Sequence, residues 1–240
     1  LLNLQYGAQQ NTAAPYFFNQ RGVALRGSID GRIHFYSNIV ESQARFPEQV
    51  QRFVAQFQAL PGNGFYKPGF SSALFGVDDG IDFLNSQAQL GFQLTEHVGA
   101  QFGYGKHFLG NGYRAGVLSD FANNYLHLTL NWRIGKLHLQ NIFAEVNSSS
   151  ARALGGSQLV PKKYLAAHYL SIRLRPNLTL GLFEAVAFSR ENNFDLQYLN
   201  PIILYRTVEQ ALGSPDNVML GFNVSWSLFQ RFQVYGQFLL

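Results

Sequence analysis

The segment Asn217–Leu240 reads NVMLGFNVSWSLFQRFQVYGQFLL, and its side chains alternate in character. Residues that are small or polar, apart from Met219, separate the apolar ones of one face in its first half, which are Val218, Leu220, Phe222, Val224, Trp226 and Leu228. A period of two is typical of a β-strand, because successive side chains of a strand point to opposite faces. The alternation resumes at Phe232 after a tight connection at Phe229-Gln230. The segment therefore predicts a β-hairpin.

Each half of this hairpin is about ten residues long, which suits a tilted strand that crosses a bilayer. Strands of ordinary globular proteins are commonly about five or six residues long. The same alternation predicts further strands over 23–29, 33–39, 84–95, 98–102, 125–134, 137–146, 169–174 and 178–189, after a partial strand at 1–6. The alternation slips near Asn141-Ile142, where we expect a β-bulge. The segment 8–21 is expected to be a polar connection.

The composition favours a membrane-embedded β-protein. Charged residues make up only 13% of the chain and aromatic residues 15%, and cysteine is absent. Because no run of 18 or more apolar residues occurs, a transmembrane helix is excluded on length. Few charges, many aromatics and strict alternation suit a barrel that is apolar outside and polar inside. A soluble β-sandwich is the alternative, since its strands alternate as well.

The connections alternate between short and long. Short ones lie near residues 30, 96, 135, 176 and 229, and long ones cover 46–81, 108–121, 148–163 and 190–216. In an up-and-down antiparallel sheet all short turns then lie at one end, as in outer-membrane barrels with short periplasmic turns and long extracellular loops. We predict an all-β transmembrane barrel, with about 10–12 strands in one domain over residues 1–240. Since the chain begins inside a strand, we expect more strands upstream.

Two of the long excursions predict short helices. Helical spacing of apolar residues runs from Pro47 to Leu60, and Asn200-Pro201 can start a second helix that Gly213 and Pro215 end. The first helix is expected to pack on the barrel mouth. A partner-binding or membrane-surface role is the alternative.

The polar faces of the strands list the residues expected to line the interior: Arg26, Arg32, His34, His127, Asn131, Arg133, Arg173, Asn223, Arg231 and Gln237. They either brace the wall through hydrogen bonds or form a basic pore or a groove for an acidic polymer. Glu184 shares parity with apolar neighbours on the lipid side, where a carboxylate is costly. We expect a bulge to turn it inward. Contact with a protein partner is the alternative.

Loop residues provide the candidate ligand-binding site: Tyr104, Lys106, His107, Asn111, Tyr113, Arg114, Tyr205, Arg206 and Glu209. Their side chains can hydrogen bond sugar or phosphate, and the glycines among them permit tight turns. No metal-spaced His cluster and no Gly-x-Ser-x-Gly motif occurs, so we expect no enzyme, metal or cofactor, although a Ser–His pair assembled by the fold stays open. Since no Lys/Arg-rich block of five or more exists, no nucleic-acid partner is expected.

The loop sequences YGKHFLGNGYRAGVLSDF and QYLNPIILYRTVEQALGSPDN, with the strands between them, resemble a family of Bacteroidota outer-membrane proteins. These are described as Wzi-like capsule-assembly proteins, with relatives named for gliding motility. The resemblance covers roughly residues 103–240 and brings no catalytic residues. It implies a barrel in the bacterial outer membrane that contacts lipid and attaches or assembles capsular polysaccharide. The alternatives are a scaffold subunit of a secretion, uptake or motility complex in the envelope, and a passive porin-like channel.

Overall fold

The alternating segments pair into a single antiparallel sheet in the computed structural model. The structure describes residues 1–9, 12–111, 115–116, 118–147, 161–190, 193–202, 204–213, 216–229 and 231–240. Within them it has twelve strands, two α-helices and short 3₁₀ turns. All twelve strands belong to one sheet, so the described residues do not form the alternative two-sheet sandwich.

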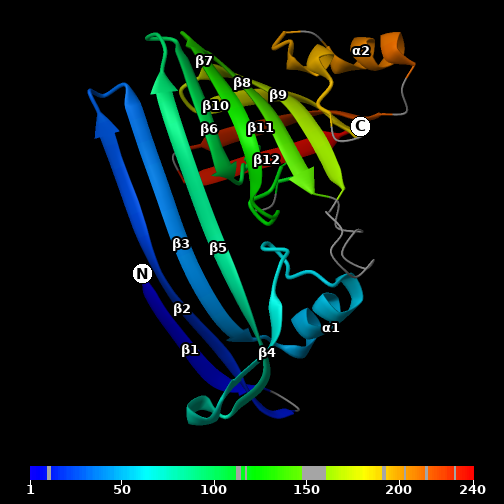
Figure 1. Ribbon diagram of the computed structural model, residues 1–240. Helices are drawn as coiled ribbons and strands as arrows, with labels where there is room; N and C mark the ends of the chain where they lie inside the picture. The colour runs from blue at the N-terminus through cyan, green and yellow to red at the C-terminus, as the bar shows by residue number, and fades with distance from the viewer. Residues whose placement is uncertain are drawn as a thin grey trace.

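The strands follow the predicted order of short and long connections. They are β1 (Leu2–Gln9), β2 (Thr12–Ile29), β3 (Ile33–Arg45), β4 (Lys67–Ser72), β5 (Val77–Gln93), β6 (Val98–Gly105), β7 (Tyr125–Ile134), β8 (Leu137–Asn147), β9 (Lys162–Arg175), β10 (Leu178–Phe188), β11 (Asn217–Leu228) and β12 (Phe232–Leu239). Each strand pairs with the next along the chain, except that β3 pairs with β5 and not with β4. Strand β4 pairs only with β5. The sheet curves, and β11 and β12 pass behind β6 to β8 (Figure 1). Among the described residues β1 and β12 do not pair with each other, so the sheet is open.

The first strands are longer than the alternation predicted. The expected connection at 8–21 was wrong, because β2 already begins at Thr12 and pairs with both β1 and β3. Asn19 and Arg21, on the same face of β2 as Leu25, are polar, so the difference in polarity between the two faces of β2 is lost there. Arg21 instead forms an ion pair with Glu41 on β3, at 2.8 Å. Pairing with neighbouring strands therefore extends β2 where the local pattern is weak.

Both predicted bulges are absent. The pairings of β8 with β7 and β9 run without a shift through Asn141 and Ile142. The pairings of β10 with β9 and β11 are equally regular at Glu184, so its side chain stays on the same face as Leu182 and Val186. The physical reason is that both polar side chains find partners on that face, as the next subsection describes.

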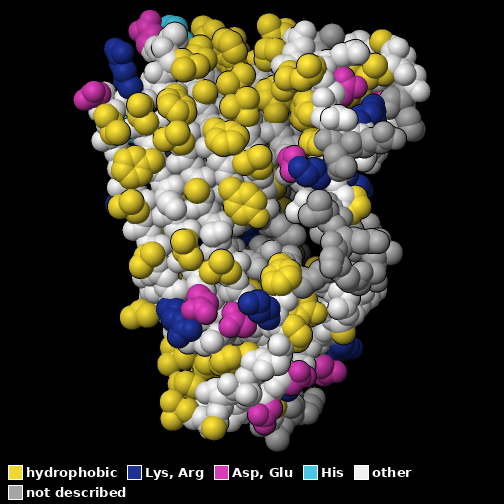
Figure 2. Space-filling view, viewed as in Figure 1, with side chains coloured by type: hydrophobic (Ala, Val, Ile, Leu, Met, Phe, Trp, Pro, Cys, Tyr) yellow, Lys and Arg dark blue, Asp and Glu magenta, His cyan; other side chains and the backbone are white. Residues whose placement is uncertain are grey.

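The two faces of the sheet differ in polarity. We call the face that carries Leu25, Leu128 and Trp226 the outer face and the opposite one the inner face. Side chains on much of the outer face are apolar and exposed: Val23 is 73% exposed, Leu25 65% and Leu182 56%. Figure 2 shows hydrophobic side chains spread over the strands, above a group of charged side chains.

Helix α1 (Glu48–Phe57) lies within the predicted range, after Pro47. It packs on the inner face, where Val54 joins a core with Ala44 and Phe83. Helix α2 (Tyr205–Leu212) begins later than predicted, with Leu204 as its N-cap, and Gly213 ends it in the left-handed conformation. Asn200 instead accepts a hydrogen bond from the Ile202 amide in the preceding turn. None of the helices that the structure describes has the length and apolar character to cross a membrane.

Candidate functional site

The structure divides the predicted ligand-binding residues between the two faces of the sheet. Lys106 and His107 begin a segment, 106–124, of which His107, Leu109 and Leu118 pack on the inner face. Tyr205, Arg206 and Glu209 belong to α2 on the outer face. Tyr104 is on the outer face of β6 and is 44% exposed, whereas Asn111 lies in the inner segment. Tyr113 and Arg114 are outside the described residues.

Consecutive residues of three strands establish this division. Ile142, Ala167 and Ala185 pack with Leu109 of the inner segment in one core. Their direct neighbours along the chain, Phe143, Ala166 and Val186, pack with Tyr198, Tyr205 and Val208 in another core. Since adjacent residues of a strand point to opposite faces, the two cores lie on opposite sides of β8, β9 and β10.

The 106–124 segment closes part of the inner face. The Leu109 amide donates to the Leu118 carbonyl at 2.9 Å, and the Gly116 amide donates to Oε1 of Gln237 on β12 at 2.8 Å. Lys106 Nζ donates to the Gly62 carbonyl at 2.6 Å, and burial lowers the pKa of this amine, partly offset by the charge of Asp120. The segment thus joins the middle of the sheet to its last strand and to the excursion that follows β3.

A polar cluster lies beneath this segment. His107 Nδ1 is 3.0 Å from the Tyr125 hydroxyl and Nε2 is 2.9 Å from Oγ1 of Thr129. The ring of His127 is 4.3 Å from that of His107, between centroids. Burial, and then the neighbouring His127, lower the pKa of His107 to about 4. Within the described residues, Nε2 of the buried His127 has no hydrogen-bond partner.

The second excursion, residues 193–213, lies on the outer face over β8, β9 and β10. Its 3₁₀ turn η3 (Leu196–Leu199) and α2 bury Tyr198 and Tyr205 completely. Arg190 and Asp216, which flank the excursion, form an ion pair, and the Tyr198 hydroxyl donates to Asp216 Oδ2 at 2.7 Å. Part of the outer face that the sequence assigned to lipid, including Val186 and Phe188, is therefore covered by protein.

Beneath α2 a row of polar side chains crosses three strands. Asn141, His168 and Glu184 are directly paired across β8, β9 and β10. Trp132 Nε1 donates to Asn141 Oδ1 at 2.9 Å, and Asn141 Nδ2 donates to the Pro201 carbonyl at 3.0 Å. We call Asn141, His168 and Glu184 the outer polar row.

Helix α2 and the turn before it supply partners for this row, although among the described residues Glu184 Oε2 is buried without a hydrogen-bond partner. The ring of His168 hydrogen bonds the Asn200 backbone. Its Nε2 lies 2.6 Å from the Tyr205 hydroxyl and accepts a hydrogen bond from it. The Arg206 amide donates to Glu184 Oε1 at 3.2 Å, in the first turn of α2, where the helix dipole favours a carboxylate. Burial, and then the charge of Glu184, raise the pKa of Tyr205, so its hydroxyl keeps its proton. Glu184 Oε1 thus has its hydrogen-bond partner within the chain, and contact with a separate protein partner stays a prediction.

The residues expected to line the interior fall into two groups. His127 lies buried under the 106–124 segment, and Asn223 accepts a hydrogen bond from the Tyr169 hydroxyl at 3.2 Å. Arg26, Arg133 and Arg173 lie on the inner face nearer the short turns and are exposed, and Arg32 lies in the turn between β2 and β3. The sequence pattern did not reveal the outer polar row. Its only signal was a polar residue at an apolar position in two predicted strands, at Asn141 and Glu184, because His168 lies just before the strand predicted at 169–174.

No group of three or more metal-ligating side chains occurs in the part of the chain that the structure describes. Comparison of the chain with protein-family models, with curated proteins and with solved structures gives no match.

Proposed function

We propose that this chain forms the wall of a bacterial outer-membrane β-barrel that acts without catalysis at the cell surface, in the attachment or assembly of capsular polysaccharide. The exposed apolar band on the outer face carries the membrane part of this proposal. Soluble monomers rarely expose contiguous apolar patches larger than a few hundred Å². The capsule role rests on the resemblance to Wzi-like proteins.

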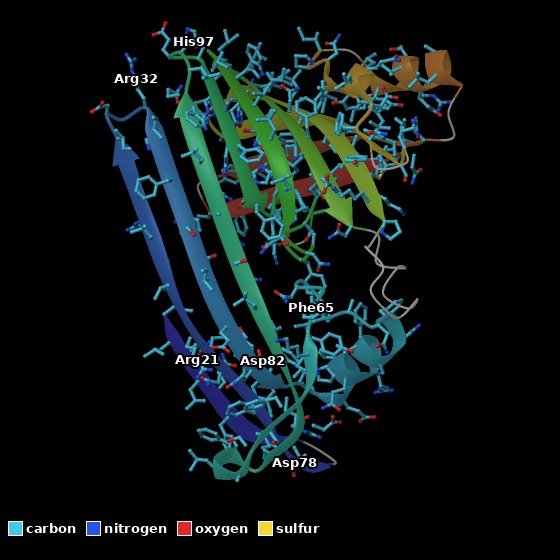
Figure 3. The ribbon with its side chains drawn as sticks, in the orientation of Figure 1. Arg21, Arg32, Phe65, Asp78, Asp82 and His97 are labelled. Atoms are coloured by element: carbon cyan, nitrogen blue, oxygen red, sulfur yellow. The ribbon has the colours of Figure 1, made fainter. Side chains whose placement is uncertain are left out.

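The extent of the band supports a bilayer-facing surface. Arg32 and His97 lie near the short-turn end of the strands, and Arg21 and Asp82 lie well along them (Figure 3). Glu41 on β3 is the ion-pair partner of Arg21. The strand path from Arg32 to Glu41 is about 30 Å long, which corresponds to about 23 Å along the membrane normal at the usual strand tilt. That height approaches the apolar band of roughly 25 Å in outer-membrane barrels. Trp226, 45% exposed and paired with Leu178 beside a short turn, fits the aromatic girdle at one boundary.

A matched pair of substitutions tests the membrane-facing surface. Leu25→Arg places a charge on the outer face in the apolar band, whereas Ala24→Arg places it on the inner face of the same strand. If lipid covers the outer face, Leu25→Arg costs about 2–4 kcal/mol near the bilayer midplane. We expect Leu25→Arg to reduce the amount of folded protein in the outer-membrane fraction and Ala24→Arg to leave it nearly unchanged. Wild-type protein that stays in solution without detergent contradicts the proposal.

Binding of surface polysaccharide is tested separately with detergent-purified protein on a glycan array. The side chain of Arg206 is 63% exposed and pairs with Glu209, so Arg206 is the most accessible residue of the candidate site on α2. We expect Arg206→Ala to weaken glycan binding and Arg52→Ala, on the exposed side of α1, to leave it unchanged. An array without signal contradicts the capsule role and leaves the membrane placement standing.

One observation favours the scaffold alternative as a second candidate. The 193–213 excursion stands on the outer face and exposes Ile202 (83%) and Leu204 (61%), which a neighbouring envelope subunit could cover. Purification in mild detergent distinguishes the two, because a complex brings stoichiometric partners and a lone barrel does not. The porin alternative is less well supported, since the 106–124 segment on the inner face predicts little conductance in planar bilayers.

A further inference from the structure

A basic hollow lies on the inner face beside the short turns of β7–β8 and β9–β10. It has a volume of about 440 Å³, and its polar lining consists of Arg133, Lys136, His138, Ser171, Arg173 and Thr179. Strand pairing brings these residues together, because Arg133 is opposite His138, His138 opposite Ser171, and Arg173 opposite Thr179. We call it the basic hollow.

The charges of the basic hollow are uncompensated. Arg133, Lys136 and Arg173 take part in none of the ion pairs among the described residues, and no carboxylate lines this hollow. Three cations on one concave surface repel one another and attract anions, and a concave wall strengthens that field. The guanidinium group binds phosphate and carboxylate through paired hydrogen bonds, and the hydroxyls of Ser171 and Thr179 can add donors.

The surroundings define how a ligand reaches the basic hollow. A second hollow of about 780 Å³ adjoins it and shares Arg133 and His138, with Gly91 and Gly99 in its lining. The only carboxylate of that lining, Glu96, pairs with His97 at 3.3 Å within the described residues. The 106–124 segment occupies the other part of the inner face. The free approach is therefore from the short-turn end.

We propose that the basic hollow binds a ligand that carries at least two negatively charged oxygen groups, either phosphates or carboxylates. Arg133 and Arg173 each hold one group and Lys136 neutralises the charge between them, while the adjoining hollow accommodates the rest of the ligand. This site goes beyond the proposed function, because it faces the short turns, opposite to the cell-surface loops. It also stands whether or not the outer face contacts lipid.

Isothermal titration calorimetry on the detergent-purified full chain tests the proposal. The probes are pyrophosphate for phosphate, trigalacturonate for carboxylate and maltotriose as the uncharged control. We expect at least one anionic probe to bind, no binding of maltotriose, and weaker binding as ionic strength rises, because salt screens exposed charges. The anionic probe that binds more tightly identifies the chemistry of the ligand.

Substitutions locate the binding. Arg133→Gln and Arg173→Gln should each weaken binding about tenfold, as expected when a charge-assisted contact is lost. Arg52→Gln on α1 removes the same charge at the other end of the sheet and should have no effect. An unchanged thermal midpoint in each variant shows that the wall is intact. Absence of binding by both anionic probes overturns the proposal, as does equal weakening by Arg52→Gln or none by Arg133→Gln and Arg173→Gln.

Discussion

Two excursions of this chain pack on the same three strands from opposite sides. The 106–124 segment lies on the inner face, where Leu109 meets Ile142, Ala167 and Ala185. The 193–213 excursion lies on the outer face, where Tyr198 and Tyr205 meet the residues that alternate with those. The inner segment joins distant parts of the sheet through hydrogen bonds of its backbone and of Lys106, whereas the outer excursion brings two buried tyrosine rings, Tyr198 of η3 and Tyr205 of α2.

The difference reflects what each face requires. The inner face carries polar side chains, and the inner segment satisfies some of them while covering an apolar patch. Where the 193–213 excursion packs, the outer face is apolar except at the outer polar row, and there the excursion supplies hydrogen-bond partners for Asn141, His168 and Glu184 Oε1. A buried polar group without a partner costs about 1–3 kcal/mol, so the row and the excursion depend on each other. Three experiments test the comparison between the two excursions, in order of decreasing effect.

The largest effect is expected from Tyr205→Ala. It removes a fully buried ring and the hydroxyl that donates to His168, and such truncations cost about 3–5 kcal/mol. Tyr205→Phe keeps the ring and loses only the hydroxyl, so we expect about 1–2 kcal/mol. Urea unfolding in detergent, followed by tryptophan fluorescence, measures both. Equal losses for the two variants would show that the ring contributes little packing.

A pH titration tests the inner segment. The pKa of His107 is about 4, below the ordinary 6.5, so between these values the unfolded chain binds the proton more readily. The contribution of His107 to stability is therefore complete above about pH 6.5 and lost as the pH falls through 4, at most about 3 kcal/mol.

In His107→Gln this part of the pH dependence should disappear from the unfolding free energy. His97→Gln, in the exposed turn after β5, is the matched control and should keep the wild-type profile. A His107→Gln profile that coincides with the wild type between pH 4 and 6.5 refutes the assignment.

The smallest effect is expected from Glu184→Leu. The substitution removes the acceptor of the Arg206 amide in the first turn of α2, and we expect a loss of about 1–2 kcal/mol. Hydrogen exchange should become faster in α2 and stay unchanged in α1. Leu182→Ala, two residues away on the uncovered outer face, should leave exchange in α2 as it is. An increase in stability for Glu184→Leu would mean that the carboxylate is not needed there.

The regular strands were predictable in detail. The alternation placed one strand at 125–134 and another at 217–228, and these are the bounds of β7 and β11. The beginning of β2 and the whole of β4 were missed, because their residues lack a clear apolar face. The bulges expected at Asn141 and Glu184 were wrong for a related reason. In both cases a polar residue at an apolar position was interpreted as the sign of a bulge. The structure shows instead that each polar side chain hydrogen bonds a segment distant in sequence.

The sequence by itself determined most of the regular strands, the short turns between them and, apart from the errors at Asn141 and Glu184, which of their side chains share a face. These features depend on backbone geometry within a few residues, which the period of two records directly. Only the tertiary structure decided that Asn141, His168 and Glu184 lie side by side, and that one excursion goes inside and the other outside. Such neighbours are set by strand register and by packing between residues far apart in the chain, and no local pattern contains that information.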